Sequence, residues 1–226
     1  KTYAPTFAEA WPEFQPAKNV KASWSWDMRK GILPPGAVVT YWWVIEDNAG
    51  NRLLTPKKSI TFDDTRYKWQ KVSDQNINIY WYQGSRSFAG DLLKAAVDAK
   101  ERLERDTGAT LDKPVYIYIY ANYSDLRGSI IAPDEWTGGV AYRGFTIISI
   151  GISPNNLDWG KKAVAHELGH LLTQQVTVSP YGEIRPYWLD EGLAMHAEGE
   201  QSAAYKKELQ NAIEDGRIAT LLSLTS

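Results

Sequence analysis

Two histidines four residues apart, with a glutamate directly after the first, place the strongest constraint on how this 226-residue chain folds. The residues are His166-Glu167-Leu168-Gly169-His170, and the chain contains only three histidines. On a helix, positions i and i+4 share one face about one turn apart, so both imidazoles can bind one zinc ion at roughly 2.0–2.1 Å. The glutamate can then act as general base toward water on that ion. The spacing therefore predicts a helix that carries part of a metal site.

A catalytic zinc site needs a third protein ligand and an open coordination position. One class of zinc hydrolase places a third histidine six residues after the second, and a glycine three residues after it. Val176 and Thr173 occupy those positions here and exclude that class. A later segment that begins with proline, as helices often do, carries the acidic pair Asp190 and Glu191 within an apolar pattern. Twenty residues separate His170 from Glu191, enough for a loop and a return, so Glu191 is the predicted third ligand and Asp190 the weaker alternative.

Two stretches, H-E-L-G-H at residues 166–170 and W-L-D-E-G-L-A at residues 188–194, make this sequence resemble a known group. It resembles the gluzincin zinc metallopeptidases, and within them the peptidase MA-like bacterial metallohydrolases. The resemblance implies a zincin-type metallopeptidase domain, one zinc ion held by His166, His170 and Glu191, and a peptide or protein substrate. Less specific similarity extends to residues 46–51, 79–84 and 115–120.

The expected activity is hydrolysis of peptide bonds by zinc-activated water, with Glu167 taking the proton and passing it to the leaving amine. Two alternatives stay open. The chain can be a binding or adhesion module with a degenerate or incomplete zinc domain, although Glu167 argues against this because a structural zinc site needs no base. It can also be a zinc hydrolase of a non-peptide bond such as an ester, since the same chemistry serves both.

Three polar residues near the predicted third ligand can orient the histidine ligands through hydrogen bonds to the ring nitrogen that does not bind the metal. Asp190 directly precedes Glu191, and Glu198 follows Glu191 by seven residues and faces the same way on a helix. His196 lies about 140° round the helix from Glu191, which favours a surface position.

The reaction also needs a hydrogen-bond donor for the oxyanion, and Tyr205 is the only tyrosine after Glu191. Similar proteins continue with further helices, so we expect a domain that is C-terminally truncated.

The composition is that of an ordinary folded protein, with 43% hydrophobic residues, 23% charged residues and a net charge of −2. No basic stripe is present, so nucleic acid is not an expected partner. No apolar run approaches the ~18 residues of a membrane-spanning helix. The lack of cysteine excludes disulfides and thiolate ligands. The sequence starts at Lys1 without a signal peptide, and by resemblance we expect a secreted or cell-envelope protein.

The first 74 residues have the pattern of an all-β unit. Residues 38–46 are rich in β-branched and aromatic side chains and predict a strong strand, and residues 48–51 predict a hairpin turn. Short strands at this spacing are typical of an immunoglobulin-like β-sandwich. We therefore predict such a domain over residues 1–74, with further strands at 21–27, 52–55, 59–62 and 67–72.

Residues 75–226 have the strand and helix order of an α+β zincin domain. The predicted elements are strands at 77–82, 115–120, 140–142 and 145–150, and helices at 87–106 and 159–174, the latter carrying the histidines. In the proteins that this one resembles, the strand shortly before the metal helix edges the cleft and pairs with extended substrate. We therefore expect the strand from Phe145 to Ile150 to do so, and the predicted cleft residues are Trp136, Gly138, Gly139 and Phe145.

Overall fold

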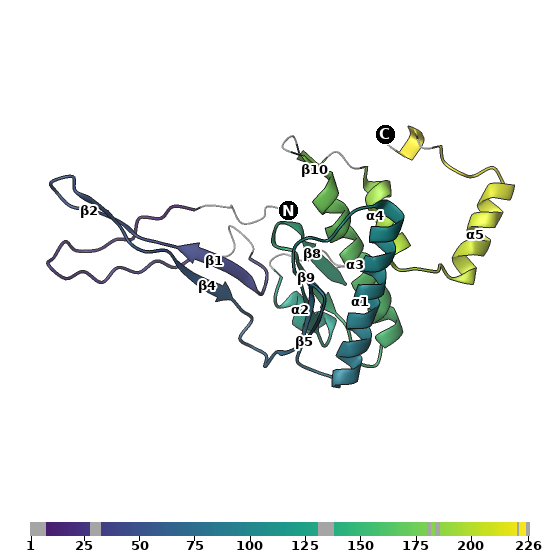
Figure 1. Ribbon diagram of the computed structural model, residues 1–226, viewed down its shortest axis with the longest axis horizontal. Coiled ribbons are helices and arrows are strands. Elements are labelled where there is room, and N and C mark those ends of the chain that lie inside the picture. The colour runs from purple at the N-terminus through teal and green to yellow at the C-terminus, as the bar shows by residue number, and fades with distance from the viewer. Residues whose placement is uncertain are drawn as a thin grey trace.

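The computed structural model of the chain describes residues 8–27, 33–130, 138–179, 182–183, 186–220 and 222–224. It is a mixed α+β structure, in which a five-stranded sheet is covered by helices and a narrow two-stranded arm extends away from it (Figure 1). The strands are β1 Ala37–Tyr41, β2 Val44–Glu46, β3 Arg52–Leu54, β4 Lys58–Phe62, β5 Gln70–Asp74, β6 Ile77–Trp81, β7 Val115–Tyr120, β8 Gly139–Tyr142, β9 Ile147–Gly151, β10 Val178–Ser179 and β11 Gly182–Glu183. The helices are α1 Arg86–Thr107, α2 Tyr123–Arg127, α3 Leu157–Thr177, α4 Tyr187–Ala197 and α5 Ala203–Glu214, with short 3-10 turns at Arg143–Phe145 and Leu222–Leu224.

The five-stranded sheet has the order β5-β6-β7-β9-β8, with β6, β7 and β9 parallel and an antiparallel strand at each edge. The three parallel strands are rich in isoleucine, valine and tyrosine and are largely buried, as expected for strands covered on both faces. The expectation that the strand at 145–150 pairs with extended substrate was wrong, because β9 already pairs with β7 on one side and with β8 on the other. The edge strand next to it is β8.

Helices α1 and α3 cover one face of the sheet and form the main core with it. Helix α1 begins where the Ser85 side chain accepts a hydrogen bond from the Phe88 amide, and it ends at Gly108 in the left-handed conformation. The helix predicted at 87–106 therefore forms, and it is one residue longer at each end. Helix α3 is longer than the predicted 159–174, and its buried residues Val164, Leu168 and Leu171 pack against this core.

The opposite face of the sheet is covered by aromatic side chains. Tyr67 and Tyr82 stack with their ring centroids 4.0 Å apart, and Trp69 meets the rings of Tyr118 and Tyr120 edge-on at 5.1 and 5.2 Å. These edge-to-face contacts are the favourable geometry for aromatic pairs. The far-face cluster, defined as these five rings with the residues packed on them, joins the base of the arm to the sheet.

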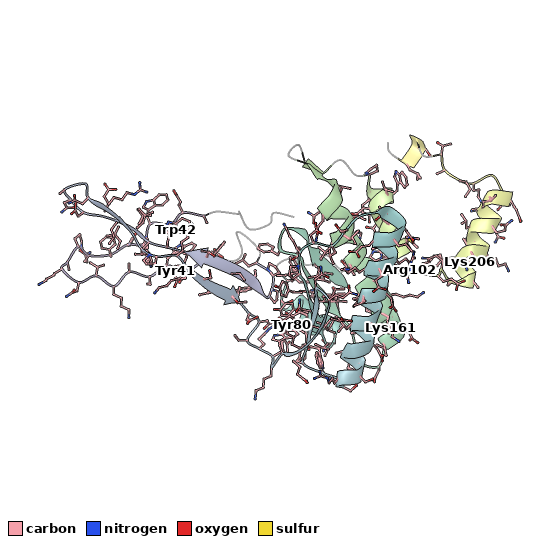
Figure 2. The ribbon with its side chains drawn as sticks, viewed as in Figure 1. Tyr41, Trp42, Tyr80, Arg102, Lys161 and Lys206 are labelled. Atoms are coloured by element: carbon pink, nitrogen blue, oxygen red, sulfur yellow. The ribbon has the colours of Figure 1, made fainter. Side chains whose placement is uncertain are left out.

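The immunoglobulin-like sandwich predicted for the first residues is not confirmed. β1 pairs with β4 and β2 pairs with β3, which gives two antiparallel ladders of two strands each, and residues 21–27 contain no strand. The arm carries Tyr41 and Trp42 along its length (Figure 2). A sandwich buries the facing sides of two sheets, whereas β2, β3 and β4 are exposed at every residue. The β-rich character was predicted, but the described residues provide no second sheet to cover these ladders.

Two features stand out at the ends of the domain predicted over residues 75–226. β5 falls before residue 75 but is an edge strand of the five-stranded sheet, so the sheet begins ahead of the predicted boundary. At the other end, α5 buries no residue and stands apart from α1 and α3 (Figure 1). No helix among the described residues is both long and apolar enough to cross a membrane.

Candidate metal centre

The site is built where α3 and α4 pack together. Gly169 lies in α3 between the two histidines of the motif. A Cβ added at Gly169 would lie 2.8 Å from the Cα of Ala194, closer than real side chains come. Ala194 and Ala197 are fully buried at this contact. Three small residues thus let the backbone of α4 approach α3 at the level of the histidines, which brings side chains of α4 within reach of the imidazoles.

The structure brings together the three residues predicted as metal ligands. The rings of His166 and His170 have centroids 4.9 Å apart. Glu191 Oε2 lies 3.4 Å from His166 Nε2, and Glu191 Oε1 lies 3.8 Å from His170 Nε2. One ligand atom from each of the three residues lies within 4.8 Å of the other two. Two atoms bound tetrahedrally to one zinc ion at 2.0–2.1 Å are about 3.3 Å apart, so the cluster needs little adjustment to hold one ion.

Each histidine of this cluster has a carboxylate behind it. His166 Nδ1 lies 2.9 Å from Glu198 Oε1, and His170 Nδ1 lies 2.9 Å from Asp190 Oδ1. Because a carboxylate only accepts hydrogen bonds, both Nδ1 atoms carry the proton, and each Nε2 presents its lone pair to a metal. Asp190, the weaker alternative for the third ligand, therefore lies behind a histidine and not among the ligand atoms. Both carboxylates fix ring orientation as well as tautomer.

Glu167, the predicted general base, faces the edge strand β8. A Cβ added at Gly139 would lie 2.8 Å from Glu167 Oε1 and 3.2 Å from its Cγ and Cδ. Gly139 is the first residue of β8. The carboxylate of Glu167 therefore lies against the backbone of the edge strand, on the same helix as both histidines.

The other predicted cleft residues are distributed differently. Gly138 lies against the ring of Trp159, since a Cβ there would be 3.5 Å from that ring. Phe145 is a partly buried residue that packs against the far-face cluster. Trp136 lies outside the described residues.

Contacts with α1 hold the C-terminal end of α4 in place. The guanidinium of Arg102, labelled in Figure 2, donates a hydrogen bond to the carbonyl oxygen of Ala197 at 2.5 Å. A cation at this position is favourable because the C-terminal end of a helix carries partial negative charge. The next residue is Glu198, so this contact supports the carboxylate behind His166.

His196 does not join the cluster: its Nε2 lies 2.9 Å from Asp106 Oδ2, and this hydrogen bond holds the pKa of Asp106 below its usual range.

Tyr187 is a residue of the site that the sequence analysis missed. It is the first residue of α4, one turn before Glu191, and its phenol lies near enough to the Glu191 carboxylate to feel its charge. The negative charge of Glu191 raises the pKa of Tyr187, and burial acts in the same direction. The i, i+4 spacing before the predicted ligand could have indicated it. Tyr205, the tyrosine that the sequence analysis noted, lies on α5, whose residues are not buried.

Comparison with known proteins places these residues in a family. A family model described as the Peptidase MA superfamily matches residues 95–226, more than half of the chain. The matched range contains α3, α4 and the whole cluster. No curated protein matches the chain.

Proposed function

This chain belongs to the peptidase MA superfamily, and on that premise we propose that it is a zinc-dependent peptidase. The family match agrees with the resemblance to peptidase MA-like metallopeptidases noted from the sequence. The observation that carries the proposal is the convergence of His166, His170 and Glu191, with Glu167 next to them on α3. The ion, the bond that is hydrolysed and the role of each residue are proposed from this geometry.

The donor set fits zinc. Two imidazole nitrogens and one carboxylate are a ligand set used by catalytic zinc sites, in which a fourth position stays open. The carboxylates of Asp190 and Glu198 keep both imidazoles in the tautomer that a metal requires. When bound, zinc would supply Lewis acidity, which makes water more acidic and polarises a carbonyl group.

Glu167 is the proposed general base and then general acid. Its carboxylate lies on the same helix as the histidines and against β8, so a water between the cluster and the strand would be within its reach. Glu167 would take a proton from that water and deliver it to the leaving amine. No covalent bond between the protein and the substrate is needed.

An extended peptide is the proposed substrate, bound along β8. β8 pairs with β9 on one side, and among the described residues no strand pairs with its other edge. A free strand edge binds extended peptides through backbone hydrogen bonds that tolerate many side chains. Because Gly139 of β8 touches Glu167, a peptide on this edge would place its backbone near the general base. This transfers to β8 the role that the sequence analysis gave to the strand at 145–150.

The substitution Glu167→Gln tests this function, because it keeps the shape of the side chain and removes its basicity. We expect the full chain and the variant to bind one equivalent of zinc each, measured by mass spectrometry of metal content. Hydrolysis of fluorescein-labelled casein and of a fluorogenic peptide library should fall about 10²–10⁴-fold in the variant. The matched control is Glu200→Gln, which removes an exposed carboxylate that accepts a hydrogen bond from Lys206. This variant should hydrolyse both substrates at the parental rate.

Three results would contradict the proposal. Full activity of Glu167→Gln would remove Glu167 from the reaction. A chain that binds zinc and cleaves esters but no peptide would be a hydrolase of another bond. A chain that binds zinc and cleaves neither would have a degenerate site, and its function would be that of a binding module.

A further inference from the structure

Two side chains of α3 lie against neighbouring residues at the start of the edge strand β8. The Glu167 carboxylate lies against Gly139, and the far end of the Trp159 ring lies against Gly138. A Cβ added at Gly138 would be 3.5 Å from both Cη2 and Cζ2 of the indole. Ala163, midway between the two residues on α3, carries only a methyl group. An aromatic ring and the proposed general base therefore border the same stretch of β8.

The backbone of β8 has hydrogen-bonding groups that face away from β9 at this point. The Gly138 carbonyl accepts a hydrogen bond from the Gly151 amide of β9 at 3.1 Å. In an antiparallel pair, residues that bond across the ladder alternate with residues whose groups point outward. Gly139 and Ala141 are of the second kind, and among the described residues no strand pairs with that edge. An extended peptide on this edge would therefore form hydrogen bonds with Gly139, directly beside Glu167.

The Trp159 ring lies within reach of a side chain of such a peptide. Trp159 and Glu167 are eight residues apart on α3, which separates their Cα atoms by about 12 Å along the helix axis. An extended chain covers that length in about four residues, at ~3.3 Å per residue. A peptide whose cleaved bond lies near Glu167 would therefore pass the ring within about four residues of that bond.

The exposed surface of the Trp159 ring is suited to an apolar partner. Trp159 is 44% exposed, whereas Val164, Leu168 and Leu171 of the same helix are buried in the core. An indole buries a large area and packs well against aromatic and aliphatic groups. Lys162 is exposed three residues further along α3, where the helix brings it next to Trp159. Its positive charge disfavours a basic substrate side chain at the ring.

We propose that Trp159 determines specificity by packing against an aromatic or branched aliphatic side chain of the substrate, within about four residues of the cleaved bond. This inference rests on the proposed peptidase function and names the class of peptide that the site prefers. Backbone hydrogen bonds to Gly139 accept any sequence, so the ring supplies the sequence preference. Apolar contacts of this kind discriminate between side chains by about 10–200-fold. Because the ring is partly exposed to solvent, we expect a value near tenfold.

The test compares Trp159→Ala and Trp159→Phe with Trp43→Ala on the full zinc-loaded chain. Trp43 is the matched control, because it is 37% exposed and belongs to the arm, which extends away from α3 (Figure 1). The substrates are fluorogenic octapeptides of alanine and serine, one without phenylalanine and the others with a single phenylalanine at each position in turn. kcat and KM are measured for each octapeptide, and mass spectrometry of the products identifies the cleaved bond.

In the parent, phenylalanine at one fixed distance from the cleaved bond should raise kcat/KM about tenfold, mainly by lowering KM. Trp159→Ala should reduce this preference to about twofold or less. Trp159→Phe should keep most of it, since a smaller aromatic ring remains at the same place. Trp43→Ala should show the parental preference.

Binding without turnover separates this inference from the proposed function. The same octapeptides are titrated by calorimetry into zinc-loaded Glu167→Gln, with and without Trp159→Ala. If the parent cleaves no peptide, but phenylalanine strengthens binding about tenfold only when Trp159 is present, the specificity role stands and the peptidase function fails. If peptides are cleaved with no preference, or with the same preference in parent and Trp159→Ala, the peptidase function stands and the specificity role is overturned.

Two further results overturn the role of Trp159. One is an equal loss of kcat/KM in Trp159→Ala for octapeptides with and without phenylalanine, because the ring would then only support the strand edge. The other is a set of octapeptides that are not cleaved and that bind equally with and without phenylalanine, or do not bind.

Discussion

Gly139 is the residue that lets the edge strand β8 lie against the Glu167 carboxylate. Any side chain at this position would place its Cβ 2.8 Å from Glu167 Oε1, where real Cβ atoms do not occur. The contact matters to the proposed function, because a general base must lie within hydrogen-bond distance of the proton that it takes. The lack of a side chain at Gly139 thus sets where the Glu167 carboxylate can lie.

The substitution Gly139→Ala should displace the Glu167 carboxylate without touching the ligand atoms of the cluster. We expect unchanged zinc content and a loss of peptidase kcat of about 10–10²-fold, since a shift of ~1 Å in a catalytic group can cost about that much. Gly144→Ala is the control, because a Cβ at Gly144, between β8 and β9, meets no atom within 4 Å. Parental kcat in Gly139→Ala would show that the carboxylate moves away freely.

The packing of α3 on α4 decides whether the cluster forms. His166 and His170 belong to one helix and need no other element to face the same way, but Glu191 belongs to α4. Its distance from the ring nitrogens depends on the close approach at Gly169 and Ala194. Arg102 of α1 holds the far end of α4 through the carbonyl of Ala197. The candidate metal site therefore depends on helix packing as much as on the motif.

Gly169→Ala should destabilise the protein, although alanine is the better helix former. Overpacking a tight contact costs typically 1–3 kcal/mol and the gain in helix propensity is up to ~1 kcal/mol, so we expect a net loss of about 1–2 kcal/mol with weaker zinc binding. Gly90→Ala in α1, where a Cβ meets nothing within 4 Å, should instead stabilise by about 0.5–1 kcal/mol. Urea unfolding of the metal-free proteins and zinc titration check this. Stabilisation by Gly169→Ala would show that α4 has room to move.

At the scale of the whole molecule, the segment between β4 and β5 connects the exposed arm to the buried sheet. Asp64 in this segment accepts hydrogen bonds from Arg66 at 2.6 Å and from the Tyr120 hydroxyl of β7 at 2.9 Å. Its backbone carbonyl accepts one from the Trp69 indole. Burial alone would raise the pKa of Asp64, but the hydrogen bonds from Arg66 and Tyr120 outweigh it and hold the pKa below its usual range. The charged form of Asp64 thus connects the base of the arm to the far face of the sheet.

Asp64→Asn should destabilise the protein in a pH-dependent way. A carboxyl whose pKa is lowered in the folded state contributes stability above its unfolded pKa of about 3.9 and loses it as pH falls through the folded value. The variant should therefore be less stable at pH 7 by about 1 kcal/mol, a modest figure because Arg66 is partly exposed to solvent. The difference should shrink at pH 3. Urea unfolding at both pH values measures it, with Asp98→Asn, an exposed partner of Lys94, as control. An equal difference at both pH values would contradict the role of the charge.

Prediction from sequence succeeded where a feature depends on near neighbours along the chain. The helix predicted at 87–106 forms as α1 over Arg86–Thr107, because capping and helical periodicity are local. The pairing of His166 with His170 follows from one helical turn. Prediction failed where the elements that pack together are far apart in the sequence. The arm has the residues of sandwich strands, but the described residues contain no second sheet that covers it. The strand at 145–150 was expected to pair with substrate, whereas β9 lies in the interior of the sheet.

The sequence by itself determined which side chains are available for chemistry: two imidazoles on one helix face, a glutamate between them, and an acidic pair on a later helix. Only the tertiary structure decided which member of that acidic pair joins the cluster and which strand lies beside Glu167. The physical reason is the separation along the chain between the residues that interact. Helix geometry is set by hydrogen bonds four residues apart, whereas the meeting of α3, α4 and β8 depends on how small residues let separate elements pack.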